Sequence, residues 1–435
     1  MKKTIIYILI LALVMAGLSS AMTGCAAKEA VPPDTSTMVG IQGSTHTGET
    51  ETQDPTEPSV LVTTAPSAPA AAEPSAPATT EPSAPATTGS SAPAITEPSA
   101  PATTDPSAPA ATESSVPEST ESSVSAPTEV PSEKQEGVSN ILTDALSKLA
   151  ENVPNPNFGT LVGEWTVLCL ARGNYYEKND AYFAGYYSRI QTTVAQTAAS
   201  VNQNGALHRA KSTENSRLIV ALSAIGKDAT NVAGWNLITP YDNFNWILKQ
   251  GINGPIWALI ALDTENYQTN DPTIRQQCID HILQKQLGDG GWALTGKVSD
   301  PDITAMALQA LYPYRQQKEV KAAADKGFEC LSALQQPTGG YVTFGDENSE
   351  SSAQVIVACA TWGINPDTDS RFIKNGVSVL DAFLAYYVKE ESGFKHIQSG
   401  KVDAMATDQG CYALIAYQRL LDEKSPLYDM RDVSR

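Results

Sequence analysis

The carboxyl-terminal two thirds of the chain alternates between two kinds of apolar segment. In the first kind, apolar side chains recur at helical spacing and leave a polar face, as Ile274, Cys278 and Ile282 do at i, i+4 and i+8. Similar spacing occurs within residues 183–190 and 379–387. In the second kind almost every position is apolar, so a helix formed there must be surrounded by protein. These segments are residues 218–225, 256–262, 305–311, 355–361 and 411–417.

The buried segments recur about every 50 residues, which indicates an array of similar helix pairs. Their starts lie near Glu164, Ser216, Gly254, Asp302, Ala353 and Gln409. Six pairs are enough to close a ring, whereas an open solenoid would leave its inner helices partly wet. We therefore predict an all-α fold, an α6/α6 toroid, with the apolar helices as an inner barrel and the amphipathic helices as an outer layer.

A shorter repeat lies between outer and inner helices. Residues 286–292 (Gln-Leu-Gly-Asp-Gly-Gly-Trp) match residues 336–341 (Gln-Pro-Thr-Gly-Gly-Tyr). The glycines permit a left-handed backbone after the outer helix, and the aromatic residue then turns inward. Two roles stay open for Trp292 and Tyr341: a wedge packed between units, or a ring that binds a ligand. Phe344 is a third candidate ligand-binding aromatic residue.

The first 24 residues have the pattern of an export signal. Two lysines follow the initiating methionine, and residues 4–18 form an apolar run that is short for a membrane-spanning helix. Residues 22–25 (Met-Thr-Gly-Cys) resemble the lipobox of bacterial lipoproteins, which implies removal of residues 1–24 and acylation of Cys25. An ordinary cleaved signal is the alternative. Acylation would anchor the protein in the lipid bilayer, so we expect it outside the cytoplasm, exposed at the bacterial cell surface.

Residues 25–135 are predicted to be the lipidated cysteine followed by a disordered tether rich in Pro, Ser, Thr and Ala. The octapeptide Glu-Pro-Ser-Ala-Pro-Ala-Thr-Thr occurs at 73–80, 81–88 and 97–104. Few large apolar side chains are present to bury a core, and proline at this density favours extended polyproline II structure. The toroid domain is then expected over residues 136–435.

The charge argues against two kinds of partner, and the cysteine content argues against disulfides and a metal site. The chain has 29 basic and 48 acidic residues, a net charge of −19, which argues against nucleic acid and against a basic membrane-docking patch. Five cysteines follow Cys25, and each lies in an apolar stretch outside any Cys-x-x-Cys pair: Cys169, Cys278, Cys330, Cys359 and Cys411. We predict buried thiols rather than a disulfide framework or a metal site.

Two motifs carry a family resemblance. Residues 286–292 resemble the Gln-Trp repeat of the squalene-cyclase and protein-prenyltransferase superfamily, whose fold is a closed α/α toroid. Residues 300–307 (Asp-Pro-Asp-Ile-Thr-Ala-Met-Ala) resemble the acidic motif of class II terpene cyclases, and also a stretch of the toroid domain of transcobalamin and intrinsic factor. Residues 140–422 are most similar to exported bacterial proteins with prenyltransferase/squalene-oxidase repeats. The resemblance implies the toroid fold and leaves the activity open.

The cyclase resemblance implies a catalytic acid at Asp302, with Asp300 beside it. Two close, buried carboxyl groups resist ionising together, so one of them can hold a proton at neutral pH. Ile303 stands where the cyclase motif has a third aspartate. The alternative is that Asp302 caps its helix by accepting backbone N–H bonds.

A glycoside-processing enzyme is a second catalytic interpretation, because α/α toroids also host such enzymes, with two carboxylates at the inner-helix ends. Four acids lie near the starts of inner helices, where they can line one mouth of the barrel or cap helices: Glu214, Asp302, Glu350 and Asp408. A zinc centre like that of the prenyltransferases is not expected, because Asp408 and Cys411 have the wrong spacing. We predict neither a metal ion nor a cofactor.

Binding without chemistry is the main functional prediction: a lipid-anchored surface toroid that takes a small molecule or glycan. The expected ligand-binding residues are Trp292, Tyr341, Phe344, Glu214, Glu350 and Asp408. The transcobalamin resemblance makes a corrinoid (cobalamin) a concrete ligand, and the affinity would come from the toroid alone or from a separate surface partner protein. The enzyme interpretations, with Asp302 as acid or with a pair of carboxylates on a glycoside, are the alternatives.

Overall fold

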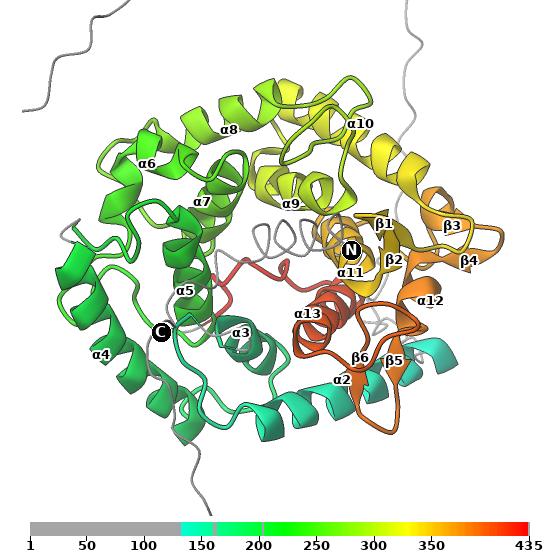
Figure 1. Cartoon of the computed structure of the whole chain (residues 1–435), viewed down its shortest axis with the longest axis horizontal. Helices are drawn as coiled ribbons and strands as arrows, with labels where there is room; N and C mark the ends of the chain where they lie inside the picture. Colours follow the sequence, from blue (N-terminus) through cyan, green and yellow to red (C-terminus); the bar gives the residue numbers. More distant parts are fainter. Residues whose placement is uncertain (1–131, 160–162, 202–203, 434–435) are drawn as a thin grey trace, which may run out of the picture. The chain divides into compact units, whose positions relative to one another are not determined.

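The computed structural model describes residues 132–159, 163–201 and 204–433, which form a helical domain (Figure 1). Outer helices alternate along the chain with inner helices. The outer helices are α2 (Glu133–Asn152), α4 (Ala181–Val201), α6 (Phe244–Leu248), α8 (Ile274–Gln284), α10 (Lys318–Leu334) and α12 (Val379–Leu384). The inner helices are α3 (Glu164–Arg172), α5 (Ser212–Ala224), α7 (Asn253–Asp263), α9 (Pro301–Leu311), α11 (Ser349–Thr361) and α13 (Ala404–Leu421).

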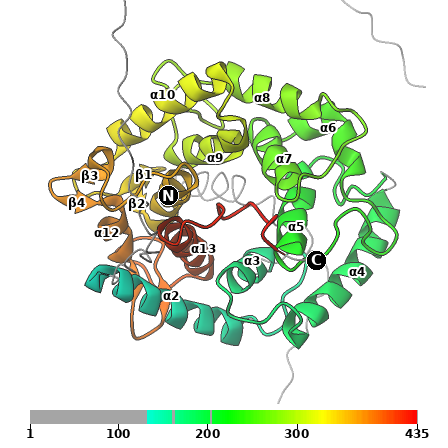
Figure 2. The ribbon, with the colours of Figure 1, turned by 180° about the vertical axis from the view of Figure 1, so that it is seen from behind.

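The inner helices close into a barrel. Each packs against the next, and α13 returns to α3, while α2 lies across α13 and α3 from outside. Figures 1 and 2 show the complete inner ring and the outer layer around it. The predicted α6/α6 toroid is therefore confirmed, and the open solenoid is excluded.

Burial follows the two predicted kinds of helix. On α7, Ile256, Ala258 and Ala261 have no exposed surface although they point in different directions around the helix. On α8 the stripe of Ile274 and Ile282 is buried against the inner layer while the opposite side faces water. The five cysteines after Cys25 are buried free thiols, as predicted.

Several inner helices begin one turn earlier than predicted. Helix α5 starts at Ser212 rather than near Ser216, and α11 starts at Ser349 rather than near Ala353. Their first turns are polar and yet almost wholly buried, so hydrophobicity along the sequence does not reveal them. These polar turns supply the side chains of the candidate site described below.

Three short antiparallel hairpins, and no longer sheet among the described residues, join the helices. They pair β1 (Tyr341–Thr343) with β2 (Asp346–Asn348), β3 (Ile373–Lys374) with β4 (Val377–Ser378), and β5 (Tyr387–Val388) with β6 (Gly393–Phe394). Short 3₁₀ turns cover Thr239–Asp242, Tyr312–Tyr314 and Ser370–Phe372.

The predicted helix over residues 379–387 is too long. Helix α12 ends at Leu384, and Tyr387 instead pairs with Phe394 in the β5–β6 hairpin. Phe394 stacks on Phe383 with ring centroids 4.8 Å apart, so the aromatic contact is made by folding the chain back rather than by another helical turn.

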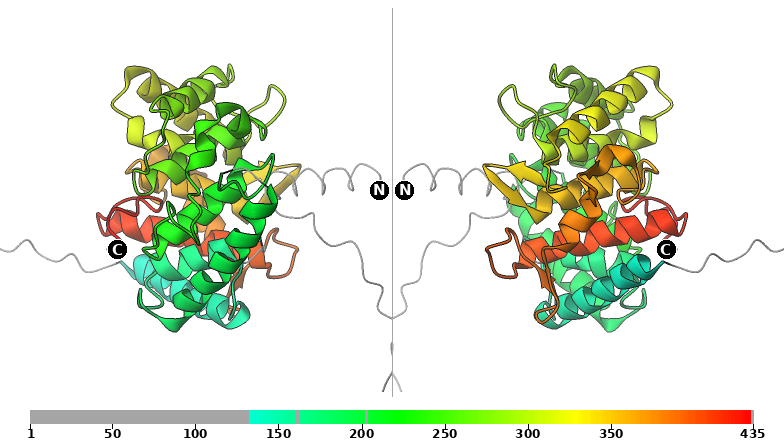
Figure 3. Two further views of the ribbon diagram at one scale, coloured as in Figure 1. Left: turned by 90° about the vertical axis from the view of Figure 1, so that its left-hand side faces the viewer. Right: turned by 90° about the vertical axis from the view of Figure 1, so that its right-hand side faces the viewer.

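The segment 422–433 covers the carboxyl ends of the inner helices. The Arg172 guanidinium donates to the carbonyls of Pro426, Leu427 and Asp429. The Met430 N–H donates to the Thr264 carbonyl at 2.8 Å. Figure 1 shows this segment, in red, passing through the centre of the ring, and Figure 3 places it on the face opposite the β1–β2 and β5–β6 hairpins. One mouth of the barrel is therefore closed by the chain itself.

The predicted signal peptide, Cys25 and the tether lie outside the described residues. Helix α2 begins at Glu133, capped by Ser132, so the folded domain starts slightly before the predicted residue 136. Within the described ranges, no helix combines the length and apolar composition that crossing a membrane requires.

Candidate active site at the amino-terminal mouth

The amino-terminal ends of the inner helices meet at one mouth of the barrel. Arg217 on α5 reaches Glu164 at the start of α3, with Nε 2.8 Å from Oε2. Thr166 on α3 donates to Asp408 on α13 at 2.8 Å. The hairpins stand on this side of the domain (Figure 3). The mouth is thus ringed by polar side chains from helices far apart in sequence.

Asp302 and Glu350 occupy equivalent positions in neighbouring repeats. Each is the second residue of its inner helix, α9 or α11, and these two helices pack together. The residues before the helices do the capping: Asp300 accepts from the Ile303 N–H at 3.0 Å, and Asn348 accepts from the Ser351 N–H at 2.9 Å. The interpretation of Asp302 as a helix cap is therefore wrong, because Asp300 fills that role and leaves the Asp302 carboxyl group available.

The surroundings of the Asp302 carboxyl group favour its protonated form. Burial raises its pKa well above the usual range, and the nearby carboxyl group of Asp300 raises it further. Two residues of α11 act on the same pKa in opposite directions: the hydrogen bond of Ser351 lowers it and the charge of Glu350 raises it. Its Oδ1 atom is buried and has no hydrogen-bond partner among the described residues. A protonated carboxyl group with an unpaired oxygen can act as a general acid toward a bound molecule.

Glu350 is oriented by a histidine from another part of the chain. Its Oε2 lies 2.8 Å from His396 Nδ1 and 3.2 Å from the Ser349 hydroxyl, while Oε1 is buried without a partner in the described structure. The hydrogen bond to Glu350 raises the pKa of His396 above its ordinary value. The Ser349 N–H also donates to the His396 carbonyl, which fixes the histidine loop at the mouth.

The β1–β2 hairpin forms one side of the rim. The hydroxyls of Thr343 and Ser351 are 2.7 Å apart, so the hairpin is tied to the first turn of α11. At its tip Phe344 has φ +58° and is 41% exposed, and the side chain of Val342 is also exposed. A non-glycine residue in the left-handed region is strained, and here it holds an aromatic ring at the edge of the mouth.

Glu214 and Asp408 are occupied by contacts within the protein. The Arg217 guanidinium bridges Glu164 and Glu214, with Nη2 2.7 Å from Glu214 Oε2. Asp408 is 1% exposed and accepts from Thr166, and burial raises its pKa to about 8. Both acids therefore lie at inner-helix ends, as predicted, but each is bonded to other groups of the protein and not to Asp302 or Glu350.

Trp292 and Tyr341 lie in the core. Neither ring has exposed surface, and their polar atoms donate to the carbonyls of Ile282 (2.7 Å) and Leu331 (3.0 Å). The packing role foreseen for these rings is the one the structure describes, so we leave them out of the site.

The turn repeat that positions these rings has a different register from the one predicted. Gln286 donates to the carbonyl of Gly290, four residues on, and the residue that repeats this bond is Gln335, which donates to Gly339. The predicted match, Gln336, is one position off. The predicted alignment paired the seven residues 286–292 with the six residues 336–341, whereas the hydrogen bonds pair 286–292 with 335–341.

A line of glutamines crosses the barrel interior. Gln309 on α9 donates to the carbonyl and side-chain oxygens of Gln354 on α11. Gln354 donates in turn to the Tyr412 hydroxyl at 2.6 Å and to Gln409 Oε1 at 3.1 Å, both on α13. Trp165 packs against Trp257 and Tyr412 and fills the remaining space. The interior beneath the mouth is therefore polar on one side and aromatic on the other.

His396 and the three glutamines were missed by the sequence analysis. Gln309 carries a usable signal, since it is a lone polar residue inside an otherwise apolar run, whereas Gln354 and Gln409 lie close to other polar residues. His396 carries none, because it lies on a loop and meets Glu350 only through the fold.

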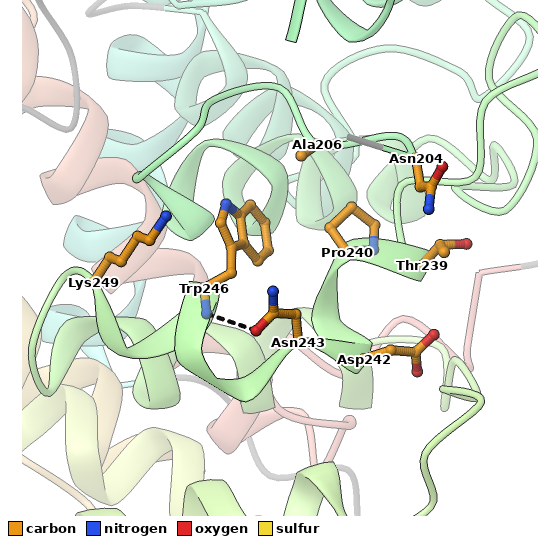
Figure 4. A pocket seen from close by; sticks show the side chains of 8 residues that line it. All are labelled: Asn204, Ala206, Thr239, Pro240, Asp242, Asn243, Trp246 and Lys249. Carbon is orange, nitrogen blue, oxygen red and sulfur yellow. Dashed lines mark hydrogen bonds between the residues drawn. The ribbon is translucent and has the colours of Figure 1, made fainter. Parts of the chain in front are cut away.

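A separate pocket of about 480 Å³ lies on the outer layer beside α6 (Figure 4). Trp246 on its wall is 3% exposed and donates to the His208 carbonyl, and Asn243 caps α6 by accepting from the Trp246 N–H. These groups serve local structure. In the described ranges no group of three or more His, Cys, Asp or Glu side chains could hold a metal ion.

Comparison with solved structures finds matches of low sequence identity. The domain resembles solved structures of unsaturated glucuronyl hydrolases. One, from Bacillus sp. GL1 and responsible for glycosaminoglycan degradation, is 13% identical with a TM-score of 0.48, and the match covers 68% of this chain and 99% of that one. Another, from Streptococcus agalactiae, is 12% identical with a TM-score of 0.42, covering 65% and 92%. No protein-family model matches the chain. No curated protein matches it by sequence.

The α/α-toroid fold rests on the packing of the inner helices described above and not on these matches. The squalene-cyclase and prenyltransferase resemblance of the motifs stays a prediction beyond that fold. The corrinoid prediction has no support in the described mouth or in the comparisons, and we do not carry it further.

Proposed function

We propose that the protein hydrolyses a glycoside at the amino-terminal mouth of its toroid, with Asp302 as general acid and Glu350 as general base. The observation that carries the proposal is the pair of carboxyl groups at equivalent positions on α9 and α11. Neither caps its helix, and each has one buried oxygen lacking a partner among the described residues. Different surroundings give them different roles: Asp302 lies beside Asp300, and Glu350 lies beside His396.

In the proposed reaction Asp302 gives its proton to the glycosidic oxygen as the carbon–oxygen bond breaks. Water adds to the sugar carbon and passes a proton to Glu350, which His396 holds in place. Proton exchange with solvent then restores both groups, so the net change is hydrolysis of one bond.

The polar interior favours a sugar over a polyprenyl chain. Terpene cyclisation needs an apolar cavity that keeps water from the reacting chain, whereas Gln309, Gln354 and Gln409 line this barrel with amide groups. The exposed ring of Phe344 at the rim supplies an apolar face on which a sugar can lie. We therefore favour the glycoside interpretation over the cyclase and binding-only interpretations.

The test is to incubate the full chain with cell-wall and plant glycans and with chromogenic glycosides, and to measure released sugar. We expect Asp302→Asn and Glu350→Gln each to lower kcat by about 10²–10⁴-fold. The matched variant is Asp300→Asn, which keeps a good helix cap. Losing the charge next to Asp302 should shift the alkaline limb of the pH–rate profile to lower pH without abolishing turnover.

Two results would contradict the proposal. One is release of sugar at the same rate by wild type and Asp302→Asn. The other is product from squalene alone, lost in Asp302→Asn, which would restore the cyclase interpretation.

We also propose that Cys25 is acylated and that the tether displays the domain outside the cell membrane. The support is the lipobox-like sequence and the proline-rich composition of the following residues. Cells grown with labelled palmitate should incorporate it into the wild-type chain but not into Cys25→Ser, and only the wild type should stay in the membrane fraction. Equal labelling of both chains would refute it.

A further inference from the structure

A second pocket lies at the opposite end of the barrel. It has a volume of about 630 Å³ and sits among the carboxyl ends of α7, α9 and α11, with residues 425–431 forming one wall. We call it the far pocket. Its lining and the Asp302–Glu350 mouth are separate sets of residues, at opposite ends of the inner helices. Its volume is within the range of sites for small molecules.

Three residues that line the far pocket each carry a buried polar atom without a partner in the described structure. The atoms are Thr264 Oγ1 on α7, Gln309 Oε1 on α9 and the Tyr428 hydroxyl on the closing segment. Their side chains are 1%, 4% and 9% exposed. Nearly all buried polar atoms in proteins are hydrogen-bonded, and leaving one unpaired costs about 1–3 kcal/mol. Three such atoms from three elements around one cavity indicate a hydroxyl-bearing ligand that completes them.

Other polar groups of Thr264 and Gln309 are hydrogen-bonded within the protein. The Thr264 carbonyl accepts from the Met430 N–H, and the Gln309 amide nitrogen donates to Gln354. The free oxygens are therefore not left over from a poorly packed region, since the same residues hold the closing segment and the inner barrel together.

The far pocket also carries one unpaired positive charge. Arg275 is paired with Asp263 at 2.8 Å and Arg431 with Asp429 at 2.5 Å. Arg315 has no carboxylate partner among the described residues; its guanidinium lies over the Tyr312 ring, 4.1 Å from the centroid, with one hydrogen bond to the Tyr312 carbonyl.

Stacking on the Tyr312 ring holds the Arg315 guanidinium in place. Most of its N–H groups remain free, and a planar guanidinium suits the two oxygens of a carboxylate or phosphate. The rings of Tyr312, Tyr314 and Tyr428 line the same cavity and offer faces for an apolar side of a ring.

We propose that the far pocket binds a small polyhydroxylated anion, a sugar acid or a sugar phosphate, with Arg315 on the anionic group and Thr264, Gln309 and Tyr428 on the hydroxyls. This site is distinct from the mouth and does not depend on the glycosidase proposal.

Isothermal titration of the full chain tests the idea with four probes: D-galacturonate, glucose 6-phosphate, glucose and inorganic phosphate. We expect one of the first two to bind at least about tenfold more tightly than glucose, which lacks the charge, and than phosphate, which lacks the hydroxyls. The better of the two tells which anionic group the pocket takes. Because Trp257 lies 6.0 Å from Tyr428, binding should also change tryptophan fluorescence.

Substitutions of the proposed binding residues test whether the ligand lies in the far pocket. Arg315→Gln should weaken binding about tenfold or more, while the exposed Arg209→Gln elsewhere should leave it unchanged. Thr264→Val and Tyr428→Phe should each weaken binding about threefold or more and should keep or raise the melting temperature of the free protein, because each removes an unpaired buried hydroxyl. Asp302→Asn should bind normally.

Three results would overturn the proposal: no heat with any probe at millimolar concentration, equal binding by Arg315→Gln and wild type, or loss of binding in Asp302→Asn. A lower melting temperature of both hydroxyl variants, with unchanged binding, would also overturn it, because it would mean that the hydroxyls serve the fold.

Discussion

Asp408 shows how one residue can make the stability of the domain depend on pH. Its carboxyl group is buried between α13 and α3, with Oδ1 bonded to Thr166 and Oδ2 unpaired among the described residues. Burial raises its pKa to about 8. In the unfolded chain the same group ionises near its ordinary pKa of 3.8. Folding at neutral pH therefore requires a proton on this residue.

The sign of the resulting pH effect follows from linkage. Between about pH 4 and pH 8 the unfolded chain loses the Asp408 proton and the folded domain keeps it, so raising the pH favours unfolding by up to about 1.4 kcal/mol per pH unit. We predict that Asp408→Asn, which can still accept from Thr166, flattens this dependence. Between pH 5 and pH 8 the melting temperature of wild type should fall more than that of the variant.

The exposed Asp280→Asn serves as control and should follow wild type at both pH values. If wild type and Asp408→Asn lose the same number of degrees between pH 5 and pH 8, Asp408 does not carry a raised pKa.

At the scale of elements, a repeated turn connects outer to inner helices. Gly290 and Gly339 have φ of +91° and +89°, and the N–H of Leu287 and of Gln336 donates to the carbonyl four residues on in each copy. The buried ring of Trp292 or Tyr341 follows two residues after the left-handed glycine. The turn thus sets both the direction of the chain and the position of the wedge between units.

We predict that Gly290→Ala destabilises the domain by well over about 1 kcal/mol, because φ is positive and the new Cβ would lie 2.7 Å from the Lys326 carbonyl oxygen. Gly288→Ala in the same turn is the matched control, since nothing lies within 4 Å of its Cβ position. Urea unfolding of the two variants should separate them. Equal midpoints would show that the left-handed turn is not needed.

At the scale of the whole domain, stability depends on closing the ring and on closing one mouth. Helix α2, the first described, packs on α13, the last, and Lys134 at its start pairs with Asp367 and with Asp381. The segment after α13 then buries Leu427 and Met430 at the carboxyl-terminal mouth. Both closures join the two ends of the folded chain, so we expect the toroid to unfold as one unit.

We predict that Met430→Ala lowers the free energy of unfolding by about 2–5 kcal/mol, the range for truncating a fully buried apolar side chain. Lys424→Ala, exposed at the start of the same segment, should have an effect within about 0.5 kcal/mol. Denaturant titrations measure both. A Met430→Ala domain as stable as wild type would show that the closing segment does not seal the barrel.

Much of the fold could be predicted from the sequence, because the helical period and the repeat of about 50 residues are local properties. Ile274, Cys278 and Ile282 were placed correctly on an outer helix for that reason. The polar first turns of α5 and α11 were not, because their residues are buried by neighbouring repeats rather than by their own hydrophobicity. Tyr387 was placed on a helix because its spacing fits, although its pairing with Phe394 decides its place.

Only part of the candidate site could be predicted from the sequence. The sequence brings Asp300 and Asp302 together, and it marks Glu350 as an acid at a helix start. It cannot show that Asp300 caps while Asp302 stays free, since both fit the first turn of α9. Nor can it join Glu350 to His396, 46 residues away, because that bond depends on the angle at which two loops meet.

The sequence by itself determined that this chain forms paired helices, which of each pair is buried, and how many pairs form the ring, because apolar periodicity needs no long-range contact to be expressed. Only the tertiary structure decided which polar groups share a mouth, which acids are paired, and that the last residues close the other end. Those outcomes depend on distances between residues far apart in the chain, and such distances are fixed only when the ring closes.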